Sequence, residues 1–179
     1  MGAKVTIDSA SMMNKGLEVM EAMHLFGVEV GKIRIVVHPQ SIVHSAVEFV
    51  DNSVIAQMGV PDMRLPIQLA LTYPERVPSL AGELYLTSVG TLTFMEPDLN
   101  KFGCLRLALS VAGRQDAAPV VMNAANEVAV RLFLEDKIRF PDIPELVAGA
   151  VEALGARTAA TIGEVLERDR EAREYVLAR

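Results

Sequence analysis

The sequence predicts an α+β protein in which a partial mixed sheet with helices is followed by a C-terminal helical bundle. Strand-like and helical patterns alternate over residues 1–74, Pro, Gly, Ser and Thr are frequent over 75–98, and apolar residues keep a helical spacing over 99–179. Hydrophobic residues make up 51 % of the 179-residue chain, but only 5 % are aromatic and there is no Trp. The predicted core is therefore aliphatic.

The first elements are predicted from short patterns in order along the chain. KVTI at 4–7 has the β-branched residues of a strand, and a helix is predicted over 12–26 because Met12, Val19, Met23 and Phe26 fall on one helical face. Gly27 is a suitable end for this helix. The continuous apolar run at 33–38 predicts a strand that is covered on both faces.

A β-hairpin and a helix are predicted next. The segments 46–50 and 53–58 flank Asp51-Asn52, a pair that tolerates positive φ and so suits a tight turn. Residues 62–72 predict a helix that is interrupted by Pro66.

The second half predicts helices near 99–112, 118–135, 142–154 and 161–178. Two pairs, Asp142 with Glu145 and Thr161 with Glu164, have the spacing of a capping box. The last helix is expected to pack on one side only. Asn123 and Asn126 are expected to form hydrogen bonds within the bundle rather than to touch a ligand.

Charge and composition disfavour several functions. The formal net charge is −6 and no basic run exceeds two residues, which argues against nucleic-acid binding and against anionic membrane surfaces. No apolar stretch approaches the roughly 20 residues that span a bilayer, and the first residues lack an apolar signal region. The single Cys104 fits a small buried hydrophobe, so we expect a cytoplasmic protein.

The segment from Asp8 to Glu18 carries the densest set of polar side chains. At about 100° per residue, Asn14, Lys15 and Glu18 share one quadrant of the predicted helix, close to Ser11. A helix N-terminus favours anions and a carboxylate binds hard cations, so the segment suits a small phosphorylated ligand and a metal. The alternative is structural: Ser11 caps the helix, and Lys15 and Glu18 form an ordinary ion pair.

Two further segments are candidates. His38 and His44 flank a Pro turn and suit acid–base chemistry, metal binding or structural hydrogen bonds, although six residues is not a recognised spacing of metal ligands. Met63 and Arg64 follow a rigid turn that could line a pocket, whereas Asp62 and Arg64 could simply pair near a helix start. No Gly-rich phosphate loop, zinc-type Cys/His set or nucleophile elbow is present.

Four motifs together resemble the 1-deoxy-D-xylulose 5-phosphate reductoisomerase family. They are MGAKVTIDSASMMNKGLE, HPQSIVHS, GVPDMRLPIQLALTYPERV and MNAANEVAVRLFL, and they cover essentially the whole chain. The family implies an N-terminal NADPH-binding domain, a catalytic domain and a C-terminal bundle. Residues 1–74 would then be the second half of the catalytic domain, 75–98 a connecting arm, and 99–179 the bundle.

The resemblance also implies residue roles. In the family, Mg²⁺ or Mn²⁺ holds the sugar-phosphate substrate, whose skeleton rearranges before NADPH reduces it to 2-C-methyl-D-erythritol 4-phosphate for isoprenoid synthesis by the non-mevalonate pathway. By position, Glu18 would bind the metal and Lys15 the substrate. The remaining roles implied are Ser9 and Asn14 at the substrate phosphate, Gly2 and Met63 at NADPH, and His44 in the catalytic pocket.

The sequence also departs from the family pattern. The family's other two metal carboxylates and its nucleotide-binding turn have no counterpart here, and Met1 matches a methionine of the family's lid loop. We therefore expect this chain to be inactive without the missing N-terminal NADPH-binding domain. The alternatives are a non-catalytic dimerisation or interaction module derived from such an enzyme, and an unrelated sugar-phosphate isomerase using His38 and His44. The family implies a homodimer.

Overall fold

A computed structural model describes residues 2–179, which form two compact units. The first unit comprises the N-terminal residues up to Ile35 together with Asp98–Arg179, and the second comprises Val36–Pro97. These units reflect contacts within this chain. The division at 74 and 98 refers to the parts of a whole enzyme, and it stays a prediction.

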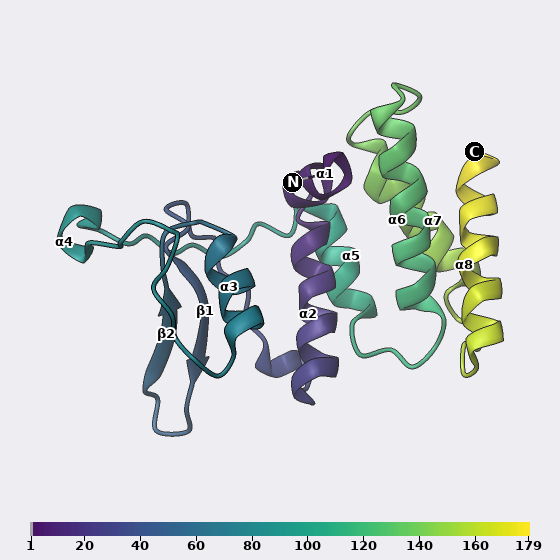
Figure 1. Cartoon of the computed structure of the whole chain (residues 1–179). Coiled ribbons are helices and arrows are strands. Elements are labelled where there is room, and N and C mark those ends of the chain that lie inside the picture. The colour runs from purple at the N-terminus through teal and green to yellow at the C-terminus, as the bar shows by residue number, and fades with distance from the viewer. Residues whose placement is uncertain (1) are drawn as a thin grey trace. The chain divides into compact units, whose positions relative to one another are not determined.

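The first unit is built of helices (Figure 1). Its elements are α1 (Ala3–Ala10), α2 (Met13–Phe26), the short 3-10 helix η1 (Val30–Lys32), α5 (Gly103–Val111), α6 (Ala118–Leu134), α7 (Asp142–Leu154) and α8 (Ile162–Leu177). Helix α6 packs against both α7 and α8, α2 packs against α5, and α1 contacts both α2 and α6. The two helices from the start of the chain thus join the four from its end.

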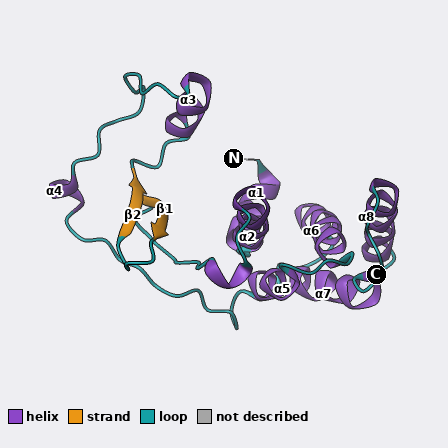
Figure 2. Cartoon of the chain, turned by 90° about the horizontal axis from the view of Figure 1, so that it is seen from below, coloured by secondary structure: helices purple, strands orange, loops and turns teal. Residues whose placement is uncertain are grey.

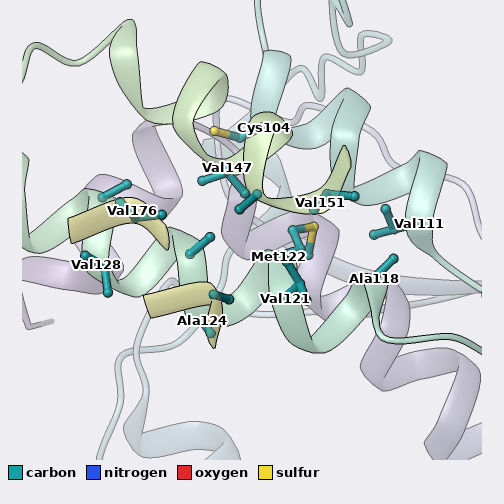
Figure 3. Packing of buried hydrophobic residues seen from close by; sticks show 14 of the residues in the cluster. Cys104, Val111, Ala118, Val121, Met122, Ala124, Val128, Val147, Val151 and Val176 are labelled. Carbon is teal, nitrogen blue, oxygen red and sulfur yellow. The ribbon is translucent and has the colours of Figure 1, made fainter. Parts of the chain in front are cut away.

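The core of this unit is aliphatic, as predicted, and consists mainly of Ala and Val with a few Met side chains (Figure 3). Ala124, Ala125 and Met122 of α6 have no exposed surface. Small residues on α6 allow its neighbours to approach closely. Cys104 is 1 % exposed and lies in this core, so the interpretation of Cys104 as a small buried hydrophobe is confirmed.

The predicted helices of this unit are present, but one predicted strand is wrong. Residues 4–7 belong to helix α1 and form no strand. Their side chains make helical contacts instead: the Lys4 ammonium lies 2.6 Å from the Asp8 carboxylate one turn later. The run of β-branched residues is too short to outweigh packing of this segment on α2 and α6. Helix α2 ends at Gly27 in the left-handed conformation, as predicted.

Only one of the two predicted capping boxes forms. Thr161 and Glu164 satisfy each other's backbone N–H groups at the start of α8. Asp142 lies inside α7, where its carboxylate accepts hydrogen bonds from the backbone and guanidinium of Arg139. Helix α8 packs on one side, with Ala172 and Val176 buried, as expected.

The second unit contains a two-stranded antiparallel sheet and two short helices joined by long loops (Figure 2). Strands β1 (Val43–Glu48) and β2 (Val54–Met58) form the predicted hairpin, followed by α3 (Arg64–Thr72) and α4 (Leu86–Val89). Asn52 has φ 65° and its N–H donates to the Phe49 carbonyl oxygen at 2.9 Å. The loop therefore spans three residues and needs positive φ at Asn52 alone.

Two predictions for this region are wrong. Residues 33–38 form no strand in the part of the chain described; Val37 makes one isolated bridge with Met95, and Val36 is 56 % exposed. An apolar run becomes a buried strand only where neighbouring strands cover it. Pro66 does not interrupt α3, because the helix begins at Arg64 and places Pro66 in its first turn. The α+β class and the helical C-terminal part are confirmed.

Within residues 2–179, none of the helices combines the length and apolar character that a membrane crossing requires.

Candidate functional site

The candidate site starts at the tight junction between α1 and α2. Ser11 ends α1, and Met12 adopts the left-handed conformation with φ 58° before α2 begins. The Ser11 hydroxyl is buried, accepts a hydrogen bond from the Met13 N–H at 3.3 Å, and donates to the Asp8 carbonyl oxygen at 3.3 Å. Ser11 thus satisfies one free N–H at the start of α2, as the structural alternative expects, although Met12 is the capping position.

One face of α2 carries three polar side chains in mutual contact. The Asn14 amide donates to Glu18 Oε1 at 2.7 Å, and the Lys15 ammonium donates to Glu18 Oε2 at 2.5 Å. The side chains of Lys15 and Glu18 are 45 % and 44 % exposed, so the cluster faces solvent. The predicted convergence of these three residues is confirmed. The ion pair of the structural alternative is also present, and each carboxylate oxygen keeps a lone pair for a further ligand.

The rest of α2 holds the helix in place. Met13 and Val19 are buried, and Gly16 faces α5 so closely that a Cβ atom on it would lie 2.2 Å from Ala108 Cβ. Only a glycine permits this approach of the two helices. Packing against α5 therefore fixes the position of the helix that carries the polar cluster.

A buried polar network that the sequence did not predict involves α1, the helix that precedes α2. The Asp8 side chain is almost fully buried; its Oδ2 accepts from the Lys4 ammonium at 2.6 Å and its Oδ1 accepts from the Asn126 amide at 2.8 Å. Asn126 forms a hydrogen bond, as expected, but its partner Asp8 lies on α1 and not within the predicted bundle of residues 99–179. Asp8 was missed as a partner because the pairing joins residues 118 positions apart, and periodicity reports only local neighbours.

The described residues do not make a metal site by themselves. No group of three or more His, Cys, Asp or Glu side chains lies close enough to hold a metal ion anywhere in residues 2–179. The Glu18 carboxylate is already hydrogen-bonded to Asn14 and Lys15. Mg²⁺ sites use carboxylates together with other oxygen ligands. Glu18 can thus be one ligand of a site whose other ligands come from elsewhere.

The two candidate histidines, His38 and His44, lie in the second unit and have different surroundings. His38 Nδ1 lies 2.8 Å from the Thr93 carbonyl oxygen, so this nitrogen carries the proton, and the ring stacks on Phe94 at 4.6 Å between centroids. His38 is therefore held as a structural side chain. His44 is exposed on β1, where the register shifts between Val43 and Ser45.

Asp62 and Arg64 form the ion pair near a helix start that the structural alternative predicts. The Arg64 guanidinium donates to both carboxylate oxygens of Asp62 at 2.5–3.0 Å, and the Arg64 N–H donates to Asp62 Oδ1 at 2.9 Å. These hydrogen bonds hold the pKa of Asp62 below its ordinary value. Asp62 thereby satisfies a free N–H at the start of α3.

The remaining predicted site residues are exposed. Gly2 is the N-cap of α1 and its carbonyl oxygen accepts from the Thr6 backbone and hydroxyl at 3.2 Å. Ser9 is exposed in the last turn of α1, and Met63, the N-cap of α3, is 69 % exposed. Met1 lies outside the described residues. The first unit holds Gly2, Ser9, Asn14, Lys15 and Glu18, and the second holds His44 and Met63.

Comparison with known proteins gives consistent matches over the whole chain. Residues 58–175 match the family model "DXP reductoisomerase C-terminal domain", and residues 1–26 match "1-deoxy-D-xylulose 5-phosphate reductoisomerase C-terminal domain". The 1-deoxy-D-xylulose 5-phosphate reductoisomerase of Pelotomaculum thermopropionicum is 55 % identical over 173 residues, which are 97 % of this chain and 45 % of that protein.

Solved structures agree with this match. The 1-deoxy-D-xylulose 5-phosphate reductoisomerase from Zymomonas mobilis, in complex with NADPH, superposes with a TM-score of 0.91 at 44 % identity, over 98 % of this chain and 46 % of that one. A DOX-P reductoisomerase in complex with NADPH, fosmidomycin and magnesium superposes with a TM-score of 0.93 at 43 % identity, over 99 % of this chain and 46 % of that one.

These findings first define a class: the fold is that of the C-terminal region of a reductoisomerase. The chain belongs to the 1-deoxy-D-xylulose 5-phosphate reductoisomerase family. It spans about half the length of the relatives it matches, 45 % in Pelotomaculum thermopropionicum and 46 % in Zymomonas mobilis.

Proposed function

We propose that this chain is the C-terminal part of an enzyme that converts 1-deoxy-D-xylulose 5-phosphate to 2-C-methyl-D-erythritol 4-phosphate, a step of isoprenoid precursor synthesis, with NADPH and a divalent metal. Its relatives carry this enzyme's name, and two solved relatives bind NADPH, one of them with magnesium. The proposal rests on one observation in this chain: the side chains of Asn14, Lys15 and Glu18 contact one another on a solvent-facing side of α2.

The three side chains supply complementary chemistry for a sugar phosphate with a bound cation. Glu18 would be one oxygen ligand of Mg²⁺ or Mn²⁺, and Lys15 would bind the substrate and offset its negative charge. Asn14 and Ser9 would donate hydrogen bonds to the phosphate, for which hydroxyl and amide groups are suited. The remaining metal ligands would come from the part of the enzyme upstream of this chain.

We assign three further residues by position. Gly2 would lie against NADPH, where its exposed backbone permits close approach, and Met63 would pack against the nicotinamide. His44 would contribute to the catalytic pocket, since its ring is exposed and available for a substrate.

We also propose that these 179 residues alone are inactive, because they carry one candidate metal carboxylate and span only 46 % of a relative that binds NADPH. A second candidate function is a dimerisation or interaction module. Exposed apolar side chains on the hairpin favour it: Val47, Val54 and Ile55 are 59 %, 60 % and 67 % exposed. A homodimer and a cytoplasmic location stay predictions.

The test is NADPH oxidation with 1-deoxy-D-xylulose 5-phosphate and Mn²⁺, followed by absorbance at the NADPH band. The chain, checked by circular dichroism to be folded, is assayed alone, then mixed with or fused to the N-terminal portion of the Pelotomaculum thermopropionicum relative. We expect turnover only in the mixed or fused sample. Turnover by the chain alone would contradict the proposed inactivity. A folded fusion that shows no NADPH oxidation would instead support the interaction module.

Substitution in the active fusion tests the roles on α2. Glu18→Gln should abolish metal-dependent turnover yet shift the free energy of unfolding by less than about 1 kcal/mol, because exposed ion pairs contribute little. Lys15→Ala should raise the KM for the sugar phosphate and leave the Kd of NADPH unchanged. Near-normal activity of Glu18→Gln, or a larger effect of Lys15→Ala on NADPH than on substrate, would contradict these assignments.

A further inference from the structure

The buried Asp8 network links the candidate site to the distant helix α6. Asp8 directly precedes Ser9 in the last turn of α1, and α1 leads through Ser11 and Met12 into α2. The partner of its Oδ1 is the Asn126 amide in the middle of α6, which is 0 % exposed. Among the residues described, this is the one side-chain hydrogen bond between α1 and α6.

This bond is poorly explained as a source of stability. A buried carboxylate must give up its hydration, and well-packed apolar residues of similar volume often stabilise a fold as much or more. Asn126 Oδ1 is buried and has no hydrogen-bond partner among residues 2–179, a further cost that an apolar pair would avoid. The best-attested use of such a buried polar pair is to fix the register of two elements.

The geometry fits that use. Both oxygens of Asp8 are engaged, one by Lys4 on its own helix and one by Asn126 on α6. A displacement of α1 along α6, or a rotation about its own axis, would break the second bond and leave Asp8 Oδ1 and the Asn126 amide buried without a partner. Apolar contacts between the helices tolerate such small shifts, whereas a hydrogen bond does not.

We propose that Asp8 and Asn126 form a positioning pair, which fixes α1 on α6 and thereby holds Ser9 and the Asn14–Lys15–Glu18 cluster in the orientation that the sugar-phosphate substrate requires. The pair acts through these residues and does not touch the substrate. The inference rests on the proposed function, and it also gives the helical bundle a role in substrate binding.

The first test needs no substrate and uses the full chain. Amide hydrogen exchange is measured for the chain and for Asn126→Leu, an apolar replacement that leaves the Asp8–Lys4 pair in place. We expect faster exchange over residues 3–18 and unchanged protection in α7 and α8. Unchanged exchange over residues 3–18 would overturn the positioning role. If Asn126→Leu fails to fold, Asp8→Ala, which removes the acceptor of the Asn126 amide, serves as the second variant with the same expected pattern.

The second test uses turnover by the fusion with the N-terminal portion. Displacing bound groups by about 1 Å can cost roughly a hundredfold in rate, so Asp8→Ala and Asn126→Asp should each lower kcat/KM for the sugar phosphate by about ten- to a hundredfold. Asp8→Ala removes the acceptor, and Asn126→Asp removes the donor and places two carboxylates against each other. The exchanged pair Asp8→Asn/Asn126→Asp restores a carboxylate–amide bond and should recover about tenfold or more.

The two tests separate failure of the inference from failure of the proposed function. An exchanged pair that is no more active than the single variants, or single variants with full activity, would overturn the positioning role. If the unsubstituted fusion shows no turnover, the proposed function fails, and hydrogen exchange still decides whether Asp8 and Asn126 hold the α1–α2 segment.

Discussion

Replacing Gly16 by Ala tests the packing that supports the candidate site. A Cβ atom at this position would lie 2.2 Å from Ala108 Cβ, whereas ordinary contacts of this kind are 3.4–4 Å. To accept the methyl group, α2 and α5 must separate by at least 1.2 Å at this point (3.4 minus 2.2). The atom in the way is a Cβ fixed to its backbone, so no side-chain rotation can relieve the clash.

The expected loss of stability follows from two opposing effects. Overpacking of a close-packed core costs about 1–3 kcal/mol, and a clash this short belongs at the upper end. Ala instead of Gly within a helix gains about 1 kcal/mol. We therefore expect Gly16→Ala to lower the free energy of unfolding by about 2 kcal/mol, since the packing cost exceeds the helix gain.

Urea denaturation followed by circular dichroism at the helix band measures this difference. The matched control is Gly163→Ala in α8, where the nearest atom would lie 3.9 Å away and the same substitution should be neutral or stabilising. The double variant Gly16→Ala/Ala108→Gly moves the methyl group to the other helix and should recover much of the loss. Gly16→Ala as stable as the unsubstituted chain, or strictly additive effects in the double variant, would refute the reasoning.

Two further predictions concern the thiol and the formed capping box. Burial raises the pKa of Cys104 from 9.0 to about 11, so a thiol reagent at pH 8 should label the folded chain at least about a hundredfold more slowly than the urea-unfolded chain. Because the unfolded thiol ionises first, stability should fall between pH 9 and pH 11 by up to about 3 kcal/mol, and Cys104→Ala should remove this part of the pH dependence. Thr161→Ala should cost about 1 kcal/mol through loss of the N-cap hydrogen bond, whereas Thr161→Ser, which keeps the hydroxyl, should cost little; equal urea midpoints for the two would count against the cap.

Local patterns predicted the parts of the fold that local interactions determine. The helical spacing from Met12 to Phe26 places Asn14, Lys15 and Glu18 together, and all three do meet on α2. The hairpin was predictable because Asn52 tolerates the positive φ that its loop requires. Each of these features depends on residues at most a few positions apart.

The predictions failed where the structure of a segment depends on contacts with residues far along the chain. Residues 4–7 have a strand-like composition, yet they form a helix that packs on α6, more than 100 positions along the chain. The same distance concealed the bond between Asp8 and Asn126. The apolar run at 33–38 shows the converse: its composition suits a covered strand, but the described chain supplies only the bridge from Val37 to Met95. A single sequence shows which residues are apolar enough to be buried, but it does not show which other segments cover them.

The packed side of helix α2 contributes to stability, whereas its exposed side carries the proposed site residues. Substitutions can therefore test stability and activity separately. Gly16 lies about 150° around the helix from the middle of the polar cluster, against α5. The exposed pair of Lys15 and Glu18 contributes about 0–1 kcal/mol to stability, whereas the packed face is expected to lose about 2 kcal/mol from one added methyl group. Substitutions on the polar face should therefore remove activity from a folded protein. Gly16→Ala should lower stability and activity together, because moving the helix also moves Glu18.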